Sequence, residues 1–102
     1  MHRLYDAETV EPCVYILANR PNGTLYVGVT SDVKRRIWQH RSAVVEGFTK
    51  QYGVYILVYV ESHATIEQAI LCEKRVKKWP RGWKLKLIEE ANPTWRNLYD
   101  EL

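Results

Sequence analysis

Cysteine is scarce in this chain, and its scarcity narrows the kinds of site that the chain can hold. Only Cys13 and Cys72 occur among the 102 residues, far apart and without a CxxC motif or a cysteine–histidine cluster. Neither a disulfide framework nor a zinc site is therefore expected. We expect both residues to be buried thiols of a protein in a reducing compartment.

Long hydrophobic runs are also missing. The longest, Val54–Val60, has seven residues, whereas a membrane-spanning helix needs about 20. The N-terminus has no apolar core of the kind found in signal peptides. We therefore expect a soluble, cytoplasmic protein with no membrane partner.

The composition that is present fits one globular domain, with 46% hydrophobic residues. We expect a flexible leader at 1–12, the domain at 13–98 and an acidic tail at 99–102. Fifteen lysines and arginines against 12 acidic residues give a net charge of +3, and most of the cations fall in Lys34–Arg41 and Lys74–Lys86. Two such blocks that converge in the fold would form a phosphate-binding surface.

Apolar runs and capping residues divide the chain into strands and helices. Strands are expected at Cys13–Leu17, Leu25–Val27 and Val54–Val60, and helices at Asp32–Val44, Thr65–Trp79 and Arg81–Ala91. The first two strands form a β-hairpin, and Gly28 is expected to end the second strand in a turn. Asp32 and Thr65 are suitable helix N-caps.

The basic helix that follows Gly28 most needs a functional explanation. Its apolar residues share one face, and Arg36 and His40 lie at the margin of that face. A cation or an imidazole in such a place loses hydration unless it has a partner. A partner is therefore expected elsewhere in the chain.

Glu73 is a candidate for that partner, because it falls in the apolar stripe of its helix. The residues of the stripe are Ile66, Ala69, Ile70 and Val76. A carboxylate there needs a cation. An ion pair with Arg36 or Lys77 and a role as a metal ligand are equally compatible with the spacing, since magnesium takes few protein ligands.

The aromatic residues divide into two groups. Tyr15 and Tyr26 lie on strands that lead toward Gly28, and their hydroxyls need a buried or ligand partner. Tyr55 and Tyr59 are interpreted as ordinary sheet residues. Core packing is the expectation, with base stacking as the alternative, for Trp38, Trp79 and Trp83.

These residues resemble the motifs of the GIY-YIG nuclease superfamily. Val14-Tyr15 is followed after ten residues by Tyr26-Val27-Gly28, with an arginine eight and a histidine twelve positions after that glycine. The chain is most similar to small single-domain bacterial members related to the N-terminal nuclease domain of the bacterial excinuclease. Cys13-Val14-Tyr15 stands where the family name has Gly-Ile-Tyr.

The resemblance implies an α/β (α+β) fold, a three-stranded antiparallel sheet flanked by helices, and a role for several residues. Tyr15 would activate the attacking water, and Tyr26 would hold water or phosphate. Arg36 would lie near the scissile phosphate, and Glu73 would bind a divalent metal, Mg²⁺ or Mn²⁺. Tyr15 is a poor base unless a nearby positive charge, from Arg36 or the metal, stabilises its phenolate.

The resemblance also implies weaker assignments. His40 matches a recurrent helix histidine, and Asn92 matches a position near the site in related domains. The residues expected to contact nucleic acid are Gly28, Lys34, Arg35, Lys77 and Lys84.

Three functions follow as hypotheses. The first is a metal-dependent endonuclease acting on DNA, including structured or damaged DNA in repair or recombination. The second is a non-cleaving DNA-binding module of the same fold in a larger assembly, with a protein partner that supplies specificity. The third, a scaffold without any nucleic-acid role, predicts no DNA binding even at low salt.

Overall fold

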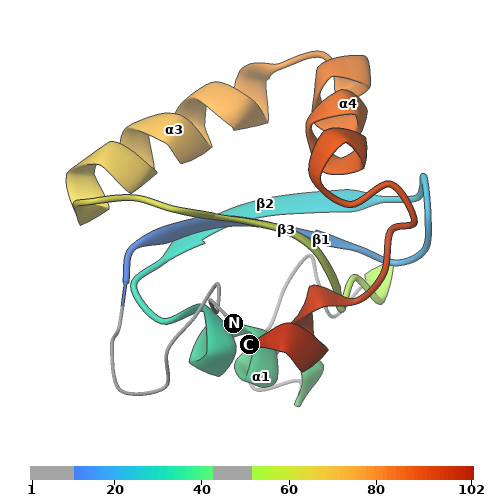
Figure 1. Ribbon diagram of the computed structural model, residues 1–102, viewed down its shortest axis with the longest axis horizontal. Helices are drawn as coiled ribbons and strands as arrows, with labels where there is room; N and C mark the ends of the chain where they lie inside the picture. The colour runs from blue at the N-terminus through green and yellow to red at the C-terminus, as the bar shows by residue number, and fades with distance from the viewer. Residues whose placement is uncertain (1–10, 43–51) are drawn as a thin grey trace.

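The computed structural model describes residues 11–42 and 52–102, and the expectations for residues 1–10 and for the helix end at Val44 lie outside these ranges. Within the described ranges, three strands form one antiparallel sheet: β1 (Cys13–Ala18), β2 (Leu25–Thr30) and β3 (Ile56–Ser62). Their order is β2-β1-β3, with β1 in the centre (Figure 1). The expected three-stranded antiparallel sheet flanked by helices is confirmed.

The central strand β1 requires a covering layer on each face of the sheet. All six of its residues are buried, and successive side chains of a strand point to opposite faces. The even-numbered residues of β1 join one apolar cluster and the odd-numbered residues join another. Figure 1 shows helices on both faces of the sheet, so each cluster has a covering layer.

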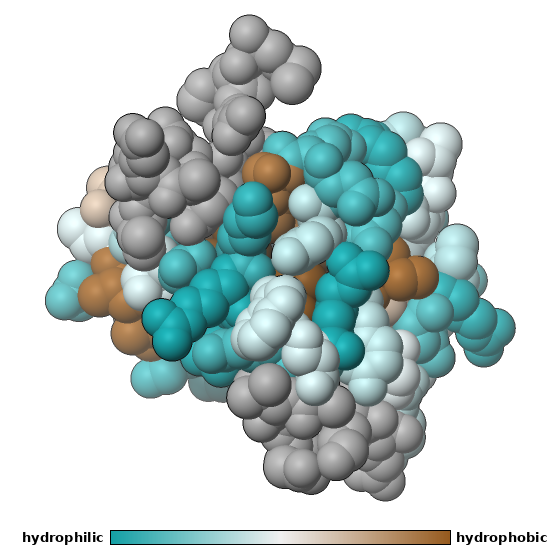
Figure 2. Space-filling view, turned by 90° about the horizontal axis from the view of Figure 1, so that it is seen from below, coloured by the Kyte–Doolittle hydropathy of each residue, from teal (hydrophilic) through white to brown (hydrophobic). Residues whose placement is uncertain are grey.

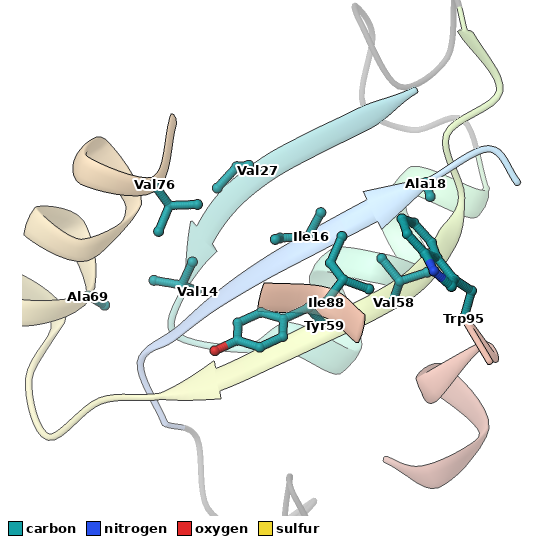
Figure 3. Close-up of a cluster of buried hydrophobic side chains, with 10 residues drawn as sticks. All are labelled: Val14, Ile16, Ala18, Val27, Val58, Tyr59, Ala69, Val76, Ile88 and Trp95. Atoms are coloured by element: carbon teal, nitrogen blue, oxygen red, sulfur yellow. The ribbon is translucent and has the colours of Figure 1, made fainter. Parts of the chain in front are cut away.

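Helices α3 (Ile66–Lys78) and α4 (Arg81–Ala91) cover the face reached by the even-numbered residues (Figures 1 and 3). Thr65 caps α3, because its side chain accepts a hydrogen bond from the backbone N–H of Gln68 at 3.1 Å. Pro80 separates the two helices, as expected from its inability to continue a helix. The buried apolar residues that these helices contribute are Ala69, Val76 and Ile88.

Helix α1 (Val33–Arg41) and the short 3₁₀ helix η1 (Leu98–Glu101) cover the opposite face. Asp32 caps α1 as predicted, since its side chain accepts a backbone N–H of the first turn at 3.2 Å. Tyr99 and Leu102, which belong to the expected acidic tail, pack against the cluster under these helices. Hydrophilic residues cover most of the described surface seen from this side (Figure 2).

The expected bounds of the third strand and the expected packing of two tryptophans are wrong. The third strand is Ile56–Ser62 rather than Val54–Val60, because its bounds follow its pairing with β1. Trp38 and Trp83 are not packed in the core, since they are 55% and 59% exposed. None of the helices in residues 11–42 and 52–102 has the length and apolar character needed to cross a membrane.

Candidate active site

Gly28 lies within β2, where it makes room for the ring of Tyr15. The two residues face each other in the antiparallel ladder, and a Cβ on Gly28 would overlap Cζ and the hydroxyl oxygen of Tyr15. The ring of Tyr15 therefore lies across β2, which is an edge strand. The turn expected at Gly28 is wrong, because β2 continues to Thr30 and the glycine serves this close approach instead.

Three rings meet beside Gly28: Tyr15 of β1, Tyr26 of β2 and His40 of α1. Their centroids are 6.3 Å apart for Tyr15 and Tyr26, 6.1 Å for Tyr15 and His40, and 5.6 Å for Tyr26 and His40. The Tyr15 hydroxyl oxygen and His40 Nε2 form a hydrogen bond at 3.2 Å. Both side chains are buried, so this bond is shielded from water.

Burial sets the protonation states of the hydrogen-bonded pair. It raises the pKa of Tyr15 above its ordinary value near 10; Tyr26 and Glu73 add to this rise, and Arg36 opposes it. Burial, and to a smaller extent the positive charge of Arg36, lower the pKa of His40 below its ordinary value near 6.5. At neutral pH Tyr15 is therefore a neutral phenol and His40 a neutral imidazole. With its proton on Nδ1, His40 can accept the Tyr15 O–H at Nε2.

The charges of Arg36 and Glu73 influence the ring cluster from helices on opposite faces of the sheet. Arg36 lies on α1 one turn before His40, and its charge acts on both Tyr15 and His40. Glu73 lies on α3, and its charge acts on Tyr15. The structure thus brings Tyr15, Tyr26, Arg36, His40 and Glu73 into one neighbourhood.

Glu73 is a buried carboxylate on the sheet-facing side of α3, 8% exposed. Its Oε2 lies 2.6 Å from Nζ of Lys77, one helical turn later. Of the ion pairs that the sequence left open, the described residues therefore form the one with Lys77. The Lys77 side chain is 52% exposed, so it can move away from the carboxylate without opening the core. A single hard oxygen donor of this kind fits Mg²⁺, which takes one or two carboxylates and keeps several waters.

Basic side chains flank β2 on both sides. On the α1 side, Arg35 and Arg36 line a hollow of about 350 Å³. On the α3 and α4 side, Lys77 and Lys84 line a hollow of about 270 Å³ together with residues of β2. The two basic blocks of the sequence therefore converge on this edge strand, and Lys34 is exposed on α1.

Asn92 ties the end of α4 to β3. It is fully buried, and its Nδ2 donates hydrogen bonds to the carbonyl oxygens of Val58 at 3.1 Å and Arg96 at 2.9 Å. Its Oδ1 accepts from the backbone N–H and the guanidinium of Arg96, each at 3.2 Å. The amide is thus engaged at both ends in structural bonds, and its expected place near the reacting groups stays a prediction.

A second cluster was missed from the sequence. Ligand atoms of Glu61, His63 and Cys72 all lie within 4.8 Å of one another. The expectation that no cysteine–histidine cluster exists is therefore wrong, because the chain returns from β3 into α3 and brings Cys72 back to His63. The available signal was a Glu-x-His sequence at the end of a strand, followed by a cysteine on the next helix.

Three comparisons relate the chain to known proteins. Residues 11–86 match the family model of the GIY-YIG catalytic domain. A UPF0213 protein of Staphylococcus haemolyticus is 36% identical over 77 residues, which make up 76% of this chain and 93% of the relative. A UPF0213 protein of Oceanobacillus iheyensis is 36% identical over 76 residues, 74% of this chain and 87% of the relative. The solution NMR structure of a UPF0213 protein from Bacillus halodurans is similar with a TM-score of 0.53 and 32% identity, covering 85% of this chain and 92% of that one.

Proposed function

Because the chain belongs to the GIY-YIG nuclease family, we propose that it is a metal-dependent endonuclease that hydrolyses phosphodiester bonds in DNA. The observation that carries this proposal is the buried hydrogen bond between Tyr15 and His40, formed against Gly28. Arg36 and Glu73 act on the same pair electrostatically. Burying so many polar groups at one sheet edge costs stability, and such convergence is typical of functional sites.

Tyr15 and His40 act in this proposal as a proton relay. A water that attacks phosphorus must lose a proton as the new O–P bond forms. The raised pKa of Tyr15 disfavours a phenolate before substrate arrives. Tyr15 instead takes the proton of the water while its own proton passes to Nε2 of His40, across the 3.2 Å hydrogen bond. The lowered pKa of His40 keeps that nitrogen unprotonated before the reaction, so that it can accept the proton.

Arg36 and a metal ion held by Glu73 would stabilise the negative charge that develops on the phosphate. The planar guanidinium of Arg36 can donate two hydrogen bonds to phosphate oxygens. Glu73 would hold Mg²⁺ or Mn²⁺, which when bound supplies Lewis acidity at the phosphate and stabilises the leaving oxygen. Tyr26, whose ring lies beside those of both Tyr15 and His40, would position the water or the phosphate.

The basic side chains along β2 support DNA as the substrate. Lys34, Arg35, Lys77 and Lys84 would contact backbone phosphates, which fixes register without reading sequence. Selectivity for structured or damaged DNA in cytoplasmic repair or recombination would then come from the shape of the DNA and from a protein partner.

A cleavage screen over branched, nicked and damaged DNAs with Mg²⁺ or Mn²⁺ tests the proposal. The wild-type chain is expected to cut at least one substrate. Tyr15→Phe keeps the ring but removes the relayed proton, so its cleavage rate should fall by about 10²–10⁴-fold. Tyr55→Phe is the matched control, because Tyr55 is half-buried outside the ring cluster, and it should cut at the wild-type rate. Unchanged cleavage by Tyr15→Phe would exclude the relay.

A non-cleaving DNA-binding module within a larger assembly is the second candidate. The ion pair between Glu73 and Lys77 favours this alternative, because the charge of the carboxylate is already balanced by Lys77 without a metal ion. This alternative predicts salt-dependent binding to the same DNAs with no product in any metal. Magnesium-dependent cleavage that Glu73→Gln abolishes would exclude the alternative, whereas cleavage retained by Glu73→Gln would remove Glu73 as the metal ligand.

A further inference from the structure

Metal-ligating side chains also gather where β3 leaves the sheet and α3 returns over it, in a cluster separate from Tyr15 and Tyr26. Glu61 lies near the end of β3, opposite Val14 in the ladder. The backbone N–H of His63 donates a hydrogen bond to the carbonyl of Pro12 at 2.8 Å, which anchors the next residues of the chain. Cys72 lies on α3 and packs against the apolar cluster on that face. Strand pairing and helix packing therefore hold these three side chains together.

The spacing of the ligand atoms is that of a metal site. Sγ of Cys72 lies 3.7 Å from Oε2 of Glu61, and Nε2 of His63 lies 2.9 Å from the same oxygen. Zinc bonds of about 2.0–2.3 Å at tetrahedral angles place ligand atoms about 3.3–3.7 Å apart. The distance between Sγ of Cys72 and Oε2 of Glu61 already lies in this range. The distance between Nε2 of His63 and the same oxygen would have to increase slightly to admit the ion.

An ion pair between His63 and Glu61 explains only part of this arrangement. Although Nε2 of His63 is close to the carboxylate, it is buried and makes no well-directed hydrogen bond within the part of the chain that the structure describes. A buried polar atom without a hydrogen bond costs free energy. Cys72 adds a third donor atom, with its S–H directed to Oε2 of Glu61.

Tyr59 orients the carboxylate for a ligand. Its hydroxyl donates a hydrogen bond to Oε1 of Glu61 at 2.5 Å, so that Oε2 is left for His63 and Cys72. In Figure 3 the ring of Tyr59 lies along β3, with the hydroxyl pointing toward the end of the strand that leads to α3. Support of a ligating carboxylate by a second hydrogen-bonding group is typical of metal sites.

We propose that Glu61, His63 and Cys72 bind a zinc ion, with a water molecule completing a tetrahedron. Carboxylate, imidazole and thiolate are ligands that zinc accepts together, whereas a thiolate does not suit magnesium. As the S–Zn bond forms, the S–H bond of Cys72 breaks and its proton passes to solvent. The Glu61 side chain is 37% exposed, which leaves access for the ion and the water. The ion would tie the end of β3 to α3, the helix that carries Glu73.

Titration of the full chain with Co²⁺ as a spectroscopic substitute for zinc tests this proposal. The wild type is expected to develop a thiolate-to-cobalt charge-transfer band that saturates at one equivalent and disappears when Zn²⁺ is added. Cys72→Ser should lose the band. Cys13→Ala is the matched control, because Cys13 is buried in the cluster on the other face, and it should keep the band. Zn²⁺ should also raise the thermal midpoint of the wild type but not that of Cys72→Ser.

Two further variants keep the test decisive if Cys72→Ser does not fold. In competition with a chromophoric chelator, His63→Gln and Tyr59→Phe should each weaken zinc binding by about tenfold or more. Glu73→Gln should keep the band, which separates this site from the proposed catalytic metal. A wild-type chain without a charge-transfer band, or a folded Cys72→Ser protein that retains it, would overturn the proposal.

Discussion

A hydrogen atom is the only side chain at Gly28 that leaves the ring of Tyr15 in its place. Gly28→Ala should therefore lower the free energy of unfolding by about 1–3 kcal/mol through overpacking. It should also slow DNA cleavage, because the displaced Tyr15 hydroxyl loses its hydrogen bond to His40. Gly82→Ala is the matched control: a Cβ there meets nothing within 4 Å on α4, so stability should rise by up to about 0.5–1 kcal/mol. Urea denaturation measures both, and wild-type stability of Gly28→Ala would contradict the close contact.

The buried imidazole of His40 makes the stability of the protein depend on pH. Burial and Arg36 lower its pKa in the folded chain below the value near 6.5 expected when unfolded. Between these two values the unfolded chain binds more protons, so the free energy of unfolding rises with pH there. This contribution is fully present above about pH 6.5 and is lost as the pH falls toward the folded pKa, with a slope of at most about 1.4 kcal/mol per pH unit.

His40→Gln removes that titration. Its free energy of unfolding should change less than that of the wild type as the pH falls from about 7 to 5. Chemical denaturation at a series of pH values measures the difference between the two proteins. An identical slope for the two proteins would mean that His40 is not held neutral by its surroundings.

At the scale of the element, α3 is a helix with a charge pair on its sheet-facing side. Lys77→Ala removes the partner that lies 2.6 Å from the buried Glu73 carboxylate. We expect the free energy of unfolding to fall by about 1 kcal/mol. That value is well below the cost of breaking a fully buried pair, because Lys77 is half exposed to water. Lys78→Ala, on the exposed side of the same helix, should have no measurable effect.

The same variant distinguishes the ion pair from metal binding at Glu73. If Lys77 and Mg²⁺ compete for the carboxylate, Mg²⁺ should raise the thermal midpoint of Lys77→Ala more than that of the wild type. Equal shifts in the two proteins would show that the ion binds elsewhere.

The elements themselves were largely predictable, because their limits depend on residues that are neighbours in sequence. Asp32 and Thr65 cap the helices that follow them, and Pro80 separates α3 from α4, as expected. Strand ends were less predictable. The bounds of β2 and β3 depend on which residues of β1 lie opposite them, and residue patterns within a single strand do not contain that information.

At the scale of the whole molecule, the basic side chains on both sides of β2 should act as one DNA-binding surface. The logarithm of the DNA affinity should fall linearly with the logarithm of the salt concentration. Arg35→Ala should make this slope shallower by about 1, as expected for the loss of one phosphate contact. Lys86→Ala is the control, since Lys86 lines a hollow with Trp79 and Trp83 instead. Fluorescence anisotropy over a salt series measures both, and equal slopes would place the DNA elsewhere.

The parts of the candidate site that the sequence could not predict are contacts between segments that are distant in the chain. The resemblance to a nuclease family makes Tyr15 and His40 candidates, yet their hydrogen bond depends on how α1 packs under the sheet. The choice of Lys77 as the partner of Glu73 depends on side-chain position as well as spacing. The sequence alone does not connect Cys72 with His63, because His63 lies nine positions earlier, across a strand-to-helix connection.

Among the strands that the structure describes, β2 lies at an edge of the sheet, and this position has a consequence for solubility. An edge strand presents unpaired backbone N–H and C=O groups that can pair with strands of other molecules, and nearby lysines and arginines oppose such aggregation. The cations proposed to hold DNA would thus also keep copies of this chain apart. A variant that lacks all of them would lose nucleic-acid affinity and at the same time become prone to edge-to-edge association.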